Sequence, residues 1–89
     1  MRFLLKLTLN QPSSEEIRAL LPAEKKRGEE LAEQEIREAV YVAADRSAVW
    51  TVWNCASQEA LEEVTKTLPL YEFWKIEITQ LAEEEPFSE

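Results

Sequence analysis

The sequence predicts one small α+β domain whose elements follow the order β-α-β-β-α-β. Two observations carry this prediction. The apolar pattern switches between a period of two and a helical period in segments that fit four strands and two helices. Short stretches rich in Ser, Pro and Asp separate those segments, as turn residues do. The chain has 89 residues, which is enough for a single domain.

The first strand and the first helix are predicted within residues 3–34. The strand alternates apolar with mostly polar side chains, its apolar positions being Phe3, Leu5, Leu7 and Leu9. Ser13 and Glu16 have the spacing of a capping box, which predicts a helix from there to about Gln34. Pro22 lacks a backbone N–H, so we expect it to kink that helix or to begin a new one.

The second half of the chain predicts a hairpin, a helix and a final strand. Residues 36–44 and 48–54 alternate as two strands around the turn residues Asp45, Arg46 and Ser47. Ser57 is placed to cap a helix that Pro69 ends, and residues 74–81 read as the last strand. We assign residues 1–82 to the domain and expect the acidic segment 83–89 to be disordered.

Composition excludes several classes of function. The formal net charge is −8, with 18 acidic and 10 basic residues, which disfavours nucleic acid and anionic membranes as partners. The absence of histidine and the single Cys55 argue against a zinc site, a disulfide within the chain and histidine-assisted nucleophiles. One glycine cannot make a phosphate-binding loop. We expect a cytoplasmic protein, because no segment reads as a signal peptide or a membrane span.

Several predicted strands are apolar on both faces, although the helices of this arrangement cover only one. Pairs such as Val40 with Tyr41, and Val52 with Trp53, place large side chains on both sides. The second face therefore predicts a homodimer or a higher homo-oligomer, as in ferredoxin-like folds of the dimeric α/β-barrel type. Isolated surface aromatic residues are the less favoured reading.

Glu24 is the candidate for chemistry. At about 100° per residue it lies in the apolar stripe of the first helix, with Ile17 and Leu31. A carboxylate on that side is costly unless it is paired or hydrated, and such a group suits proton transfer. Gly28 follows one turn later and leaves space beneath the helix.

Other readings of these two residues stay open. Glu24 could pair with an arginine such as Arg46, or be an exposed first-turn carboxylate if Pro22 bends the helix. Gly28 could serve only the close packing of the helix on the sheet.

The chain resembles the muconolactone isomerases. The similarity is carried by the first helix, with Leu20-Leu21, Glu24 and Arg27-Gly28, and by the aromatic third strand. Its most specific piece is Leu68-Pro69-Leu70, followed at fixed spacing by Tyr71, Phe73 and the alternating last strand. The resemblance implies a ferredoxin-like subunit that dimerises through its sheet. It also implies a proton shift in a small unsaturated lactone without a cofactor, with Glu24 as the catalytic base.

One stretch departs from that family. A basic Arg-x-x-Leu-Trp-Arg-like segment is expected on the second strand, whereas this chain has Ala39, Val40, Tyr41 and Val42. Arg37 falls on the other register of the alternating strand, and Arg46 lies in the turn. The sequence therefore favours a neutral or apolar small-molecule ligand, in a pocket to which we assign Leu20, Gly28, Val42, Arg46 and Trp50.

Two hypotheses of function follow. The first is a cofactor-independent isomerase acting on a small lactone or carbonyl compound through Glu24. The second is a non-catalytic ligand-binding or assembly module that kept the scaffold and lost the chemistry.

Overall fold

A computed structural model describes residues 1–82 and has the predicted βαββαβ order. The elements are β1 (Arg2–Leu9), α1 (Glu15–Glu33), β2 (Arg37–Val42), β3 (Val49–Asn54), α2 (Gln58–Thr65), the short 3₁₀ helix η1 (Tyr71–Phe73) and β4 (Trp74–Gln80). The expected acidic tail at 83–89 lies outside the described residues.

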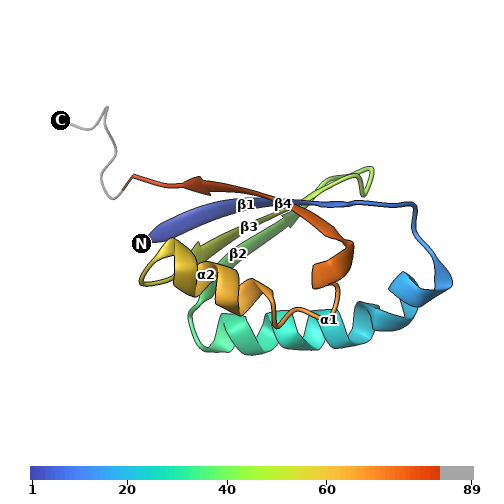
Figure 1. The fold of residues 1–89 in the computed structure, drawn as a ribbon, viewed down its shortest axis with the longest axis horizontal. Coiled ribbons are helices and arrows are strands. Elements are labelled where there is room, and N and C mark those ends of the chain that lie inside the picture. Colours follow the sequence, from blue (N-terminus) through green and yellow to red (C-terminus); the bar gives the residue numbers. More distant parts are fainter. Residues whose placement is uncertain (83–89) are drawn as a thin grey trace.

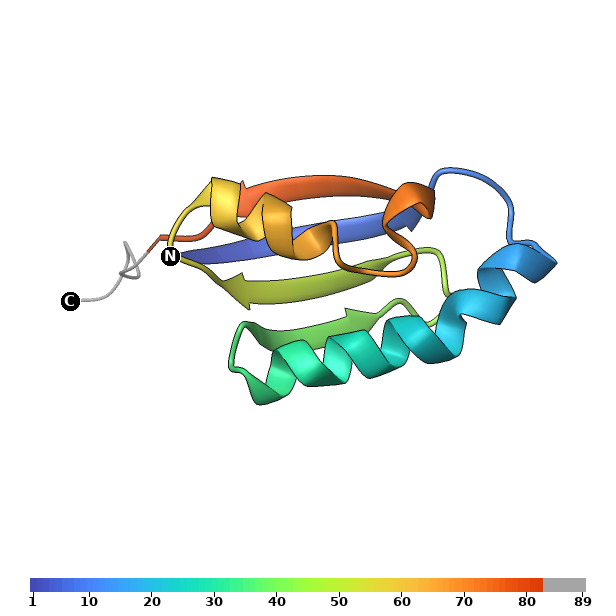
Figure 2. The same ribbon diagram turned by 60° about the horizontal axis from the view of Figure 1, so that its bottom comes forward.

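The four strands form one antiparallel sheet in the order β2-β3-β1-β4. Both helices lie on the same side of this sheet, α1 beneath β2 and α2 nearer β1 and β4 (Figures 1 and 2). This is the predicted ferredoxin-like arrangement. The other face of the sheet carries no element of the described chain.

The core fills the space between the helices and the sheet. Its buried residues come from both layers: Phe3, Leu5, Leu7, Leu31, Trp53, Leu61 and Leu68. Ile76 and Ile78 of β4 pack against this cluster, as the alternation of that strand predicted. Phe3, Leu5 and Leu7 bury the alternate side chains of β1, which confirms the period of two.

Helix α1 differs from the prediction in its first residues. The N-cap is Ser14, whose hydroxyl accepts a hydrogen bond from the Ile17 N–H at 3.3 Å, and not Ser13. The helix continues through Pro22 as one element instead of restarting there. Helix α2 begins after Ser57 as expected but ends at Thr65, so turns and not helix lead to Pro69.

Strand β2 contains an irregularity that the sequence did not predict. Arg37 pairs with Trp53 and Ala39 pairs with Val52, so a β-bulge lies between Arg37 and Ala39. A bulge inserts one extra residue and reverses the alternation beyond it. Arg37 therefore shares the helix-facing side with Val40 and Val42, which corrects the expectation that it falls on the other register.

Candidate functional site

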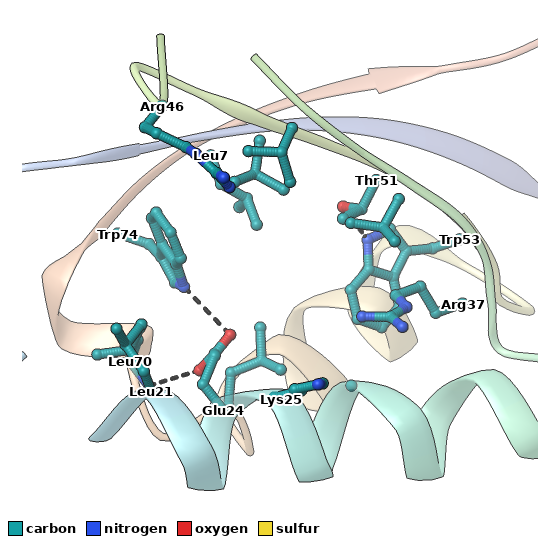
Figure 3. A pocket seen from close by; sticks show the side chains of 15 residues that line it. Leu7, Leu21, Glu24, Lys25, Arg37, Arg46, Thr51, Trp53, Leu70 and Trp74 are labelled. Carbon is teal, nitrogen blue, oxygen red and sulfur yellow. Dashed lines mark hydrogen bonds between the residues drawn. The ribbon is translucent and has the colours of Figure 1, made fainter. Parts of the chain in front are cut away.

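A cavity of about 440 Å³ lies between α1 and the sheet (Figure 3). Its wall is largely apolar, built from Leu7, Leu21, Val40, Val42, Val49, Leu68, Leu70 and the two indoles of Trp53 and Trp74. Gly28 and Thr51 also line it, together with four charged residues: Glu24, Lys25, Arg37 and Arg46. An apolar cleft with few polar groups is the usual form of a small-molecule site.

Glu24 is half-buried and its carboxylate is held by two donors. The Leu70 N–H donates to Oε1 at 2.8 Å, and the indole Nε1–H of Trp74 donates to Oε2 at 3.4 Å. Figure 3 shows the carboxylate reaching from α1 toward both donors. Glu24 is thus neither the partner of Arg46 nor an unattached surface carboxylate, because no ion pair of the described residues includes it.

The segment after α2 supplies one of these donors. Leu68 and Leu70 are both buried and anchor the segment, while the Tyr71 N–H donates to the Leu68 carbonyl at 2.9 Å. Pro69 between them fixes its own φ and has no N–H to satisfy. The Leu70 N–H is thereby directed at α1, and the chain can return to β4 with Trp74 at its start. The Leu-Pro-Leu segment thus positions the Glu24 carboxylate.

Gly28 lies one turn after Glu24 and faces Arg37. A Cβ at this position would collide with the Arg37 guanidinium, so the missing side chain leaves room for it. Figure 3 shows Arg37 extending toward α1 beside Trp53. The absence of a side chain at Gly28 therefore leaves space beneath the helix, and the Arg37 side chain occupies that space.

Arg46 reaches the cavity from the β2–β3 turn. Its φ of 66° is a left-handed conformation that few non-glycine residues adopt. The preceding Asp45 accepts a hydrogen bond from the Ser47 N–H at 3.0 Å, and its bonds to Ser47 hold the pKa of this carboxyl below its usual value. With Lys25 and Arg37, Arg46 gives the cavity three cations against the single carboxylate of Glu24, in a chain whose net charge is −8.

Four of the six residues assigned from the sequence line this cavity, namely Glu24, Gly28, Val42 and Arg46. Trp50 does not, because the alternation of β3 places Thr51 and Trp53 on the helix side and Trp50 on the open face. Trp53 takes the inner position, and its indole donates to the Thr51 hydroxyl at 2.6 Å.

Leu20 does not line the cavity either. At about 100° per residue it lies roughly 60° to one side of Ile17, whereas Leu21 and Lys25 lie on the other side. The cavity opens on that second side, so Leu21 is the lining residue.

The sequence did not reveal Arg37, Trp74 or the Leu70 N–H as parts of the site. Trp74 had a visible signal, since it shares the alternation of Ile76 and Ile78 and therefore their face of the sheet. No sequence signal predicted the position of Arg37, because no glycine or proline marks the bulge in β2. A backbone donor such as the Leu70 N–H depends on tertiary packing alone.

The described residues contain no cluster of three or more Cys, Asp or Glu side chains able to hold a metal ion. None of the helices within residues 1–82 has the length and apolar character needed to cross a membrane.

Comparisons with protein families and with solved structures both show similarity to known proteins. The family described as muconolactone delta-isomerase matches residues 1–85. A crystal structure of muconolactone isomerase at 3.3 Å resolution superposes with a TM-score of 0.84 and 26% sequence identity, covering 99% of this chain and 94% of that one. A comparison with curated protein sequences gave no match.

Proposed function

The chain belongs to the muconolactone delta-isomerase family, and from this membership we propose that it is a cofactor-independent isomerase that shifts a proton within a small lactone or related carbonyl compound. Glu24 is the proton carrier. The single observation that supports this role most strongly is the Glu24 carboxylate, fixed by two donors at the wall of an apolar cavity.

The proposed reaction moves one proton and one double bond. The Glu24 carboxylate takes the proton from the carbon next to the carbonyl group, and the electron pair of that C–H bond passes into the conjugated system as an enolate. The protonated Glu24 then returns the proton to the far end of the conjugated system. The base is regenerated and no oxidant or reductant is consumed.

The surroundings of Glu24 suit such a step. The Leu70 N–H and the Trp74 indole restrict the carboxylate to one orientation, which places its lone pairs without further ordering during the reaction. Lys25, Arg37 and Arg46 are the cations that line the same cavity, and a cation stabilises the negative charge that develops on an enolate oxygen.

A non-catalytic ligand-binding module is the second candidate. It is favoured by the aliphatic side chains of Val40 and Val42, which line the cavity on the strand where the resemblance to the family leads us to expect arginines. Such a module would bind small molecules in the cavity and leave the position of their double bond unchanged.

Turnover of muconolactone and of a neutral lactone analogue, by wild type and Glu24→Gln, separates the two candidates. The variant keeps the size of the side chain and one oxygen acceptor but cannot take a proton. We expect turnover of at least one compound by the wild type and a loss of about 10²–10⁴-fold in the variant. Ligand binding without turnover by the wild type would support the second candidate.

We also propose that the protein works as a homodimer or a larger homo-oligomer that joins copies through the open face of the sheet. Leu4, Tyr41, Trp50 and Val52 place apolar side chains on that face, and Tyr41 is 63% exposed in the single chain. A contiguous apolar patch of this kind is typical of an interface.

A further inference from the structure

We infer that Arg37, seated against Gly28, is the residue that anchors the ligand in the cavity, and that the ligand part it binds is a carboxylate. This inference rests on the proposed function, since the ligand is taken to be the compound on which Glu24 acts. It assigns to one arginine of β2 the cationic role that Ala39 and Val42 cannot fill.

The bulge in β2 is the first observation. Without it, Arg37 would alternate with Val40 and Val42 and would point to the open face of the sheet. With it, Arg37 pairs with Trp53 on the helix side and lines the cavity. A bulge that redirects one side chain into a cleft is typical of a functional position.

Gly28 is the second observation and is independent of the bulge. It is buried, it is the only glycine of the chain, and it lies in the interior of α1, where glycine is unfavourable compared with alanine. A Cβ at this position would strike the Nη1 atom of Arg37 and lie in tight contact with its Cζ atom. A side chain at position 28 would therefore displace the Arg37 guanidinium from the place that it occupies beneath the helix.

The third observation is that Arg37 has no acidic partner among residues 1–82. The ion pairs of this part of the chain are Arg2–Glu38, Arg27–Glu30 and Lys66–Glu63, and no side-chain hydrogen bond of the described residues includes Arg37. A half-buried guanidinium that lines a cavity and makes no hydrogen bond or ion pair with residues 1–82 is suited to an anion, and its planar fork matches a carboxylate.

The positions of Arg37 and Glu24 also fit one small ligand. Figure 3 shows Arg37 on the Trp53 side of the cavity and Glu24 on the side of Trp74. A ligand whose carboxylate binds Arg37 extends across apolar wall toward the Glu24 carboxylate, while like charges keep its own carboxylate away from that base. This arrangement departs from the neutral or apolar ligand that the sequence favoured.

The test measures equilibrium binding through the fluorescence emission of the tryptophans that line the cavity. Muconolactone is the carboxylate probe, and its methyl ester is the neutral probe of similar shape. The proteins are wild type, Arg37→Gln, Gly28→Ala, the double variant and Arg18→Gln. Arg18 is exposed on α1 and does not line the cavity, so it is a control for the loss of one positive charge.

We expect Arg37→Gln to weaken binding of the acid by tenfold or more, because it removes charge-assisted hydrogen bonds, and to change binding of the ester by less than about twofold. Gly28→Ala should weaken the acid similarly by displacing the guanidinium. Its melting temperature should equal or exceed that of the wild type, because alanine favours the helix. The double variant should bind the acid no more weakly than Arg37→Gln alone.

Acid binding that is unchanged in both single variants, or equal affinity of acid and ester for the wild type, would overturn the inference. Failure of the proposed function is seen separately in Glu24→Gln. The proposed function fails if turnover survives in that variant. Preference of the variant for the acid over the ester would still support the role of Arg37.

Discussion

Glu24 receives its two hydrogen bonds from residues that follow it by 46 and 50 positions in the chain. At the scale of single residues, the site therefore depends on tertiary contacts. For each hydrogen bond to Glu24, the sequence predicted the acceptor but not the donor. The position of Glu24 in the apolar stripe of α1 was readable from spacing. The Leu70 N–H and the Trp74 indole, which decide how its carboxylate points, were not.

Trp74→Phe tests the contribution of the longer of these two bonds. The variant keeps an aromatic ring in the cavity wall and removes only the Nε1–H donor. Because one hydrogen bond contributes about 0.5–1.5 kcal/mol, we expect turnover to fall by about 2–12-fold, far less than in Glu24→Gln. Trp50→Phe is the matched control on the open face, and a similar loss there would remove Trp74 from the role.

Cys55 gives a second prediction at this scale. Burial raises the pKa of the Cys55 thiol above its usual value, with the nearby N-terminal ammonium as a smaller opposing influence. Since the thiolate is the reactive form, alkylation by iodoacetamide at pH 8 should be slower than that of free cysteine. The pH profile of the rate should have its midpoint above that of the unfolded protein, and coincident midpoints would contradict the burial argument.

At the scale of elements, α1 ends in a Schellman motif without its usual glycine. The Ile36 N–H donates to the Leu31 carbonyl and the Glu35 N–H donates to the Ala32 carbonyl, both at 3.0 Å. Glu35 has a φ of 62°, which is unfavourable for a residue with a Cβ. Glu35 lies between the end of α1 and the start of the bulged strand β2, and this conformation turns the chain from one into the other.

Glu35→Gly should therefore stabilise the protein. Glycine adopts positive φ without steric cost, and after its greater entropy in the unfolded chain is subtracted we expect a gain of about 0.5–1 kcal/mol. Glu29→Gly is the control, because it makes the same chemical change at an exposed position inside α1 and should cost about 1 kcal/mol. Urea denaturation measures both, and a loss of stability in Glu35→Gly would contradict the motif.

The elements were predictable where one period governs a segment. The core-facing positions of β1 and β4 follow from alternation, and α1 follows from its stripe and its serine cap, within one residue. The prediction was wrong at β2, because the bulge changes the register without a glycine or proline to mark it. It was also wrong about the end of α2, where turns replace the last helical residues before Pro69.

At the scale of the whole molecule, the order of elements was sufficient to predict the fold, since βαββαβ chains place both helices on one face. The cavity was not predictable to the same degree. Its wall combines residues of both layers, and the choice of Leu21 over Leu20, or of Trp53 over Trp50, depends on where the helix lies on the sheet. The net charge of −8 likewise gives no indication that cations outnumber carboxylates among the residues that line the cavity.

The open face of the sheet carries the prediction about assembly. Trp50→Glu places a charge beside Tyr41 and Lys6, and we expect it to shift the protein toward single chains in light scattering. Tyr71→Glu is the control, because Tyr71 is an exposed aromatic residue of η1, away from that face. An unchanged molar mass in Trp50→Glu would place the contact elsewhere.

The most direct test of the central claim is exchange of the proton next to the lactone carbonyl, followed by NMR in D₂O with muconolactone as the substrate. If Glu24 removes that proton, the wild type will accelerate exchange of the substrate or label the isomerised product. Glu24→Gln should do neither while still binding the compound. Exchange in Glu24→Gln at the rate of the wild type would show that another group is the base and would contradict the account.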